Sequence, residues 1–192
     1  MVDALTKTET PVTEPADSAV HAEVQRFYAH QMHLLDDGHA EDWARTFTDD
    51  GVFEVGTDAV RGAAGIARAA RHTTDRFAAD GIVRRHWIGM LAVTTVRRAG
   101  TVAAEENGAG DDSGPGEGNG PADRNGSGND SGSGNENGPA DEVVARSYAL
   151  VLETPRGGDP VVRRSTVCTD TLVRADGVWR VRHRRVTRDG LD

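Results

Sequence analysis

The sequence predicts an α+β domain in which helices come first and long antiparallel strands follow. Apolar residues recur at helical spacing within residues 18–79, whereas β-branched and aromatic residues dominate residues 82–96 and 142–187. Glycine-containing turns separate the last strands, so these strands should be antiparallel neighbours. Segregated helices and strands of this kind favour helices packed on one sheet.

Three helices are expected before the long strands. Asp17 or Ser18 can cap the first helix, and Gly38 ends it. Trp43 and Phe47 lie one turn apart in the second helix, and the pair Asp80-Gly81 ends the third. The expected helices are Ala19–Asp37, Ala40–Phe47 and Ala63–Ala79.

Five strands are expected, and all but the first are long. A turn at residues 49–51 leads into the first strand, and turns at residues 155–158 and 175–177 separate the last three. The expected strands are Val52–Val55, Ile82–Val96, Glu142–Thr154, Val161–Arg174 and Val178–Thr187.

The chain of 192 residues suits one domain, with two segments outside its core. Residues 1–17 are rich in threonine, proline and acidic residues, which predicts a disordered tail. Residues 18–190 form the domain, and residues 101–141 interrupt it with a glycine-, asparagine- and serine-rich insertion. Because strands flank this insertion, we expect a disordered loop at a hairpin tip.

Charge and cysteine content exclude several classes of function. The net charge of −9 equals the excess of ten acidic residues over Arg124 between Glu105 and Glu142, so the rest of the chain is nearly neutral. Neither nucleic acid nor a membrane surface is therefore an expected partner. The single Cys168 suits a reducing compartment, and no segment resembles a signal peptide, so we expect a cytoplasmic protein.

Cofactor and metal sites are not expected either. His30 and His33 lie three residues apart on the first helix, but no third ligand follows at a suitable spacing. No glycine-rich loop joins a strand to a helix, as phosphate-binding loops do.

The strand at residues 82–96 carries one titratable group near its middle, His86. Strand alternation places Arg84, His86, Ile88, Met90 and Ala92 on one face, and Arg85, Trp87, Gly89, Leu91 and Val93 on the other. Both faces are largely apolar, so each should be covered. An imidazole on such a face is a candidate acid–base catalyst. The alternative is a core histidine bonded to a backbone carbonyl.

Three motifs in this order resemble the nuclear-transport-factor-2-like superfamily. They are Asp42-Trp43, the segment Phe47-Thr48-Asp49-Asp50-Gly51-Val52-Phe53, and the segment Asp176-Gly177-Val178-Trp179-Arg180-Val181. The resemblance covers nearly all of residues 18–189 except the insertion. It implies a cone-shaped domain, in which three helices pack on a curved, mostly antiparallel sheet and leave a pocket.

Within that superfamily the chain is similar to SnoaL-like polyketide cyclases and to scytalone dehydratase. Residues 85–89, Arg-His-Trp-Ile-Gly, look like the segment that holds a catalytic histidine in the dehydratase, and His86 matches that histidine. Thr166 and Cys168 fall where that enzyme has polar pocket residues. Glu153 falls near the position of its second catalytic histidine, and its paired tyrosines have no exact match here.

Asp170, His183 and Tyr28 complete the candidate catalytic group. Asp170 shares a strand face with Thr166 and Cys168 and is the expected carboxylate partner of His86. A salt bridge from Asp170 to an arginine is the alternative. His183 should face the pocket if Trp179 does, as a second acid–base candidate. Tyr28 is a candidate hydroxyl donor to an enolate oxygen, or else a packing residue.

Two functions of different classes follow from the resemblance. The first is a cofactor-independent cyclase, dehydratase or isomerase acting on a small aromatic polyketide-type intermediate in bacterial secondary metabolism. The second is a non-catalytic ligand-binding or accessory subunit, similar to the β-subunits of ring-hydroxylating dioxygenases. Trp87, Leu91 and Val93 on the outer face favour a homodimer in either case. The expected pocket lining is Tyr28, Trp43, Phe47, Phe53, Ile88, Met90, Thr166 and Cys168.

Overall fold

A computed structural model describes residues 12–97 and 142–191 of the chain. The predictions for residues 1–11 and for the insertion at 101–141 lie outside these described residues. In chain order the elements are β1 (Val12–Pro15), α1 (Ser18–Asp36), α2 (Ala40–Ala44), β2 (Phe47–Val55), β3 (Asp58–Arg61), α3 (Ala63–Ala79), β4 (Ile82–Arg97), β5 (Glu142–Pro155), β6 (Val161–Ala175) and β7 (Val178–Arg188).

The predicted α+β fold is confirmed. Helix α3 has the expected bounds, α1 is displaced by one residue at each end, and the long strands β4–β7 each extend one residue beyond the expected end. Two short strands were missed. Val12–Pro15, within the expected tail, pairs with the end of β4, and β3 pairs with β2. The second helix is shorter than expected, since the chain is already extended at Phe47.

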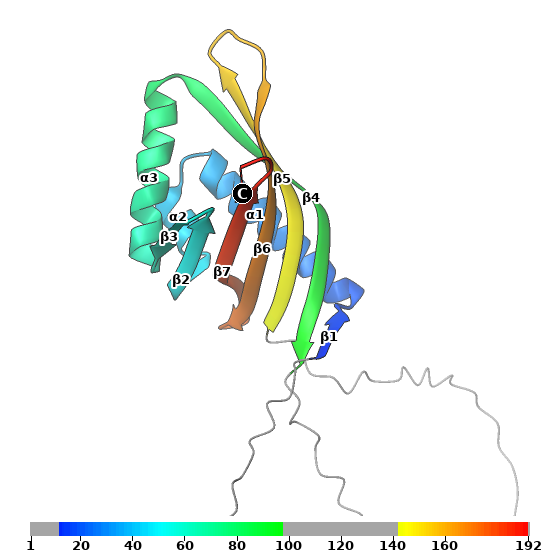
Figure 1. Ribbon diagram of the computed structural model, residues 1–192. Helices are drawn as coiled ribbons and strands as arrows, with labels where there is room; N and C mark the ends of the chain where they lie inside the picture. Colours follow the sequence, from blue (N-terminus) through cyan, green and yellow to red (C-terminus); the bar gives the residue numbers. More distant parts are fainter. Residues whose placement is uncertain (1–11, 98–141, 192) are drawn as a thin grey trace, which may run out of the picture. The chain divides into compact units, whose positions relative to one another are not determined.

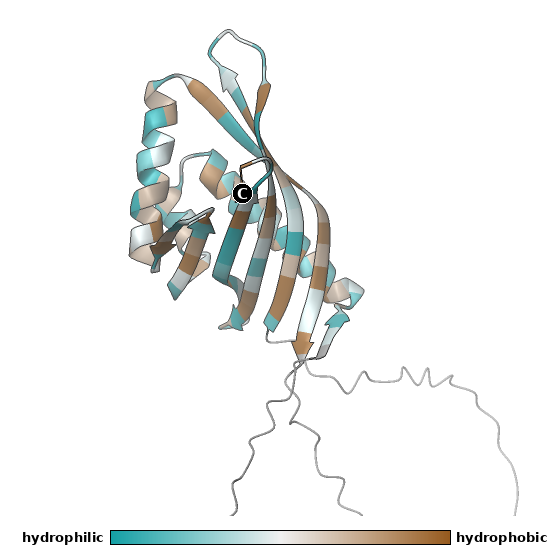
Figure 2. Ribbon diagram, viewed as in Figure 1, coloured by the Kyte–Doolittle hydropathy of each residue, from teal (hydrophilic) through white to brown (hydrophobic). Residues whose placement is uncertain are grey.

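The described strands form one curved, open sheet in the order β1-β4-β5-β6-β7-β2-β3 (Figure 1). All neighbouring pairs are antiparallel except β2 and β7, which run parallel. Apolar and polar residues follow one another along the long strands (Figure 2), as expected for a sheet with one covered face. Helix α1 lies across that face, here called the inner face.

The core joins the helices to the inner face of the sheet. Asp17 caps α1 by accepting a hydrogen bond from the backbone N–H of Val20 (2.8 Å). The buried core residues come from helices and strands alike: Val20, Val24, Tyr28, Trp43, Phe47, Ile66, Val143, Leu172, Trp179 and Val181 are among them. Gly38, at a φ of +84°, ends α1 and turns the chain toward α2.

Among the irregularities of the sheet, the β-bulges in β4 and β7 change which of the predicted site residues reach the inner face. In β4 one extra residue lies between Gly89 and Ala92, where Met90 has a φ of +51°. In β7 one extra residue, Arg182, lies between Val181 and His183. Because each bulge shifts the alternation by one residue, side chains beyond it point to the face opposite the one that simple alternation predicts.

Candidate active site

A cavity of about 280 Å³ lies between the helices and the inner face of the sheet. Its walls are mainly apolar and come from every helix and from all strands except β1. The lining residues are Met32, Leu35, Trp43, Phe53, Val55, Val60, Ile66, Ala69, Ala70, Thr73, Arg84, His86, Ile88, Ala149, Val151, Arg164, Thr166, Cys168, Arg184, Val186 and Arg188. An apolar cavity of about 150 Å³ holds benzene, so this one has room for a fused-ring aromatic compound.

His86 lines the cavity and is paired with Asp36, the last residue of α1. The ring nitrogen Nδ1 of His86 lies 2.5 Å from Oδ1 of Asp36, and the backbone N–H of His86 donates to Oδ2 (2.9 Å). The side chain of Asp36 is only 6 % exposed, and that of His86 is 15 % exposed. The expected pairing of His86 with Asp170 is therefore wrong, although the expectation of a carboxylate partner is right.

Asp36 was missed because its partner lies 50 residues away in the chain. The sequence nevertheless contained a feature that points to Asp36. Asp36 and Asp37 stand at the C-terminal end of a helix, where the macrodipole disfavours negative side chains. Two carboxylates at that position therefore indicate that at least one of them has a role other than stabilising the helix. The start of β4 explains that role, because it brings the backbone N–H and the ring of His86 to the same carboxylate.

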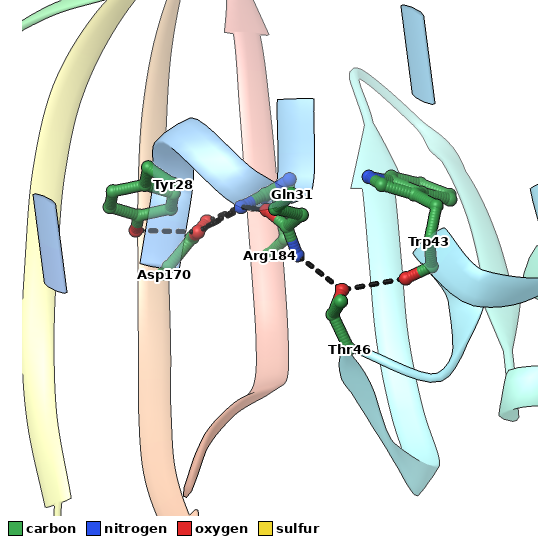
Figure 3. Close-up of polar contacts among 6 residues, drawn as sticks. All are labelled: Tyr28, Gln31, Trp43, Thr46, Asp170 and Arg184. Atoms are coloured by element: carbon green, nitrogen blue, oxygen red, sulfur yellow. Dashed lines mark hydrogen bonds and ion pairs between the residues drawn. The ribbon is translucent and has the colours of Figure 1, made fainter. Parts of the chain in front are cut away.

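A second polar group lies buried behind the cavity wall, around Asp170 and Arg184 (Figure 3). Nε of Arg184 donates to both carboxylate oxygens of Asp170 (3.0 Å each), and Nη2 donates to Oδ2 (2.5 Å) and to Oε1 of Gln31 (2.7 Å). The hydroxyl of Tyr28 donates to Oδ2 of Asp170 (2.7 Å). Asp170 is thus in a salt bridge with an arginine, the alternative that the sequence left open.

Arg184 is a functional candidate that sequence reasoning missed. It lines the cavity and is 4 % exposed, and within the described residues its Nη1 has no hydrogen bond. Burial alone would lower the pKa of Arg184, but the charge of Asp170 and the hydrogen bonds to it raise that pKa above its ordinary value. Arg184 therefore stays charged and is held rigidly at the cavity wall.

Burial also fixes the protonation states of two other candidates. It raises the pKa of Tyr28, and the neighbouring charge of Asp170 raises it further, so this side chain is a neutral hydrogen-bond donor. Tyr28 is not among the residues that line the cavity. Burial likewise raises the pKa of the Cys168 thiol, which keeps it protonated and unreactive at neutral pH.

The bulges move two predicted residues out of the site. Met90 was expected beside His86, but it lies within the bulge, is 80 % exposed and is not among the residues that line the cavity. His183 was expected to face the pocket with Trp179, but the extra residue in β7 turns it outward. There its Nε2 lies 3.0 Å from Oε2 of Glu54. Both placements correct the sequence prediction.

The remaining predicted residues divide between lining and core. Trp43, Phe53, Ile88, Thr166 and Cys168 line the cavity as expected. Phe47 does not; it is fully buried and packs edge-on against Trp43 at 5.0 Å between ring centroids. The hydroxyl of Thr166 donates to the carbonyl of Ala149 (3.0 Å) and is thereby satisfied within the sheet.

In the described parts of the chain, no three histidine, cysteine, aspartate or glutamate side chains converge on one point. No helix among the described residues is both long enough and apolar enough to cross a membrane.

Comparison with known proteins identifies relatives in bacteria. The structure of Aln2 from a Streptomyces species is 27 % identical, with a TM-score of 0.64 over 93 % of this chain and 96 % of that one. A protein from Catenulispora acidiphila, solved in complex with S-DNPA, is 30 % identical, with a TM-score of 0.61 over 90 % and 96 % of the two chains.

A more distant structure shares the fold alone. It is the β subunit of a putative aromatic-ring-hydroxylating dioxygenase from Novosphingobium aromaticivorans, 15 % identical with a TM-score of 0.57 over 91 % of this chain and 92 % of that one. No curated protein matches the chain significantly. The model of the SnoaL-like domain matches residues 16–117, more than half of the chain. Together with the helices, curved sheet and cavity described above, this match shows that the chain belongs to the SnoaL-like family.

Proposed function

We propose that this protein is a cofactor-independent acid–base enzyme acting on a small aromatic polyketide-type intermediate in bacterial secondary metabolism. Its reaction is a cyclisation, a dehydration or an isomerisation. The observation that carries the proposal is the pair of His86 and Asp36 at the wall of an apolar cavity. The ligand complex of the Catenulispora relative and the Streptomyces source of Aln2 support the choice of substrate and setting.

The geometry of His86 suits removal of a proton from carbon. Asp36 accepts a hydrogen bond from Nδ1–H, which leaves Nε2 as the basic nitrogen and stabilises the imidazolium that forms. A carbon next to a carbonyl group is the acidic position that such a base attacks. The electron pair left by the proton moves to the carbonyl oxygen, where it forms an enolate.

Arg184 is placed to stabilise that enolate. Its guanidinium is fixed by Asp170 and Gln31, so it needs no reorganisation when negative charge develops in the cavity. The imidazolium of His86 then returns its proton, either to carbon, which completes an isomerisation, or to a departing hydroxyl, which completes the loss of water. A ring closes instead when the enolate carbon attacks a second carbonyl group of the same substrate. The electron pair of that carbonyl then moves to its oxygen, which takes the proton from the imidazolium. Asp170 and Tyr28 act behind the wall by holding Arg184.

The alternative, a non-catalytic accessory subunit, predicts a different interior. A cone filled by side chains, with His86 bonded only to backbone, would suit that role. The described structure instead has an open cavity, and His86 is paired with a buried carboxylate. The distant dioxygenase β subunit supports a shared fold and no more.

A homodimer in the cytoplasm is part of the proposal. Trp87, Tyr148 and Leu150 leave apolar side chains exposed on the outer face of the sheet, and a second copy of the chain is the occupant we propose for them. The free, buried Cys168 suits a reducing compartment.

The direct test compares two histidines of the same sheet. His86→Asn keeps a hydrogen-bonding side chain toward Asp36 but removes the base, whereas His183→Asn changes a histidine that pairs with Glu54 outside the cavity. Each variant is incubated with candidate aromatic polyketide intermediates, and products are followed by mass analysis for isomerisation or loss of water. His86→Asn should lower turnover by roughly a hundredfold or more, the scale of a positioned general base. His183→Asn should turn over as the wild type does.

Circular dichroism and thermal unfolding of both variants establish that the fold is intact. A folded His86→Asn variant with wild-type turnover would refute the assignment of His86 as the base. If no candidate intermediate is converted but one of them binds in the cavity, the accessory-subunit function is favoured instead.

A further inference from the structure

Apart from His86 and Cys168, every ionisable residue that lines the cavity is an arginine. Four arginines line it, whereas none of its lining residues in the described chain is an aspartate or a glutamate. Arg184 is neutralised from behind by Asp170. The other three, Arg84, Arg164 and Arg188, come from β4, β6 and β7 and are here called the arginine rim.

Arg84 is only partly neutralised. Its Nε lies 3.6 Å from Oε1 of Glu153, too far for a good hydrogen bond, and Oε2 of Glu153 also pairs with Nε of Arg163 (3.4 Å). The Nε atom of Arg84 is buried and has no hydrogen-bond acceptor among the described residues. Arg84 is held in place by stacking on Phe77, at 4.4 Å from the guanidinium carbon to the ring centroid.

Arg164 differs from Arg84 in its surroundings. It is exposed, and in the described parts of the chain it forms no ion pair with a carboxylate. Arg164 stands opposite Val151, which in turn stands opposite His86, so all three lie on the inner face at one level of the sheet. Two strand spacings separate the backbones of His86 and Arg164, which is about 10 Å.

We propose that the arginine rim binds a carboxylate, and that the natural substrate is therefore an aromatic acid. Its carboxylate would lie at Arg164 while the reacting carbon lies at His86, with the aromatic rings over Val151 between them. This inference rests on the proposed function and specifies the substrate class of the same cavity. A guanidinium recognises a carboxylate through paired, charge-assisted hydrogen bonds, which are about twice as strong as neutral ones.

Equilibrium binding of two matched probes tests the inference without any need for turnover. The probes are 2-naphthoic acid and its neutral amide, 2-naphthamide, titrated by calorimetry. The wild type should bind the acid at least tenfold more tightly than the amide. Arg164→Gln should remove this preference and leave the affinity for the amide unchanged.

Arg163→Gln is the matched control. Arg163 is the neighbouring residue of the same strand, has a side chain that is 57 % exposed, and is not among the residues that line the cavity. This variant loses the same charge, so it should keep the preference for the acid. Loss of the preference in Arg163→Gln to the same degree as in Arg164→Gln would show a general effect of charge and would overturn the inference.

Other outcomes also overturn it. Equal affinities of the wild type for acid and amide would refute a carboxylate site, and tighter binding of 2-naphthyl phosphate would assign the rim to a phosphate ester. These results are separable from the proposed function. If the acid preference is absent while His86→Asn abolishes turnover, only the carboxylate inference fails. If the preference is present while His86→Asn turns over normally, the assignment of His86 as the base fails.

Discussion

At the scale of one residue, Asp36 is the carboxylate that, in the proposed mechanism, positions the base without itself reacting. It holds the imidazole of His86 through Nδ1 and through the backbone N–H of the same residue. Asp36→Asn keeps an oxygen for the backbone N–H but removes the charge that stabilises the imidazolium. We expect turnover to fall at least tenfold while KM changes little, because the substrate contacts other walls.

Steady-state kinetics on the purified variant measure this split. Asp37→Asn is the control, since Asp37 is the neighbouring acidic residue and caps α1 through its backbone N–H, which the substitution leaves unchanged. A rise in KM with unchanged kcat in Asp36→Asn would show that Asp36 binds substrate and does not position the base.

Asp170 matters for the stability of the fold, because it neutralises the buried charge of Arg184. Asp170→Asn would leave the guanidinium of Arg184 without its counter-ion in an enclosed site, at a cost of about 3–5 kcal/mol. Tyr28→Phe removes one hydrogen bond to the same carboxylate, at a cost of about 1.5–3 kcal/mol. Thermal or denaturant unfolding should therefore rank Asp170→Asn as clearly the less stable variant. Equal losses would mean that the buried charge is solvated in another way.

Asp36 and Asp170 also show which features of the site could be predicted from the sequence and which could not. Alternation along β6 correctly places Thr166, Cys168 and Asp170 on one face. Which basic group each acid meets depends on contacts between residues 14 and 50 positions apart, and several arginines and histidines compete for them. Chain order does not rank those competitors, so the partner of His86 required the structure.

At the scale of elements, the bulge in β4 decides which side chains reach the cavity. Met90 has a φ of +51°, a conformation that costs a residue other than glycine about 1–3 kcal/mol. Its side chain is 80 % exposed, so removing it loses little packing. Met90→Gly should therefore raise the free energy of unfolding by up to about 1 kcal/mol. This gain is smaller than the cost of the positive φ, because glycine also has a larger conformational entropy in the unfolded state.

Ala92→Gly is the matched control for this prediction. Ala92 is exposed on the same strand, just beyond the bulge, and has no positive φ. Glycine there relieves no strain and should lower the free energy of unfolding by about 0.5–1 kcal/mol. Denaturant titrations at equal protein concentration compare the two variants. A loss in Met90→Gly as large as that in Ala92→Gly would contradict strain at the bulge.

The elements themselves were largely predictable, and the bulges were not. Long periodic segments such as α3 and β4 carry enough repeats for their type and bounds to be read from the chain. The strands β1 and β3 have four residues each, too few for a period to emerge. A bulge adds one residue without any required residue type, so alternation continued through it misplaced Met90, Leu91 and His183.

At the scale of the whole described domain, the two faces of the sheet differ in what they carry. The inner face carries the cavity and its charged groups, whereas the outer face carries exposed apolar side chains on β4 and β5. Trp87 pairs with Leu150 across these strands, Gly89 pairs with Tyr148, and the side chains of Trp87, Tyr148 and Leu150 are 70 %, 47 % and 38 % exposed. Leu91 and Val93, which the sequence placed in this patch, belong to the inner side.

Substitutions in this patch test the proposed homodimer. Burying two such patches against each other would remove apolar side chains of both copies from water, and a two-fold interface needs only one self-complementary surface. The double variant Trp87→Glu/Leu150→Glu places like charges opposite each other in that interface. Sedimentation velocity at micromolar concentration should show a dimer for the wild type and a monomer for this variant.

Val178→Glu is the control, because Val178 is also apolar and 53 % exposed but lies at the start of β7, two strands away from β5 in the sheet. It should remain a dimer. The double variant should still bind 2-naphthamide as the wild type does, because the cavity lies on the other side of the sheet and no lining residue is changed. A wild type that sediments as a monomer would refute the interface, and the exposed Trp87 would then need another partner.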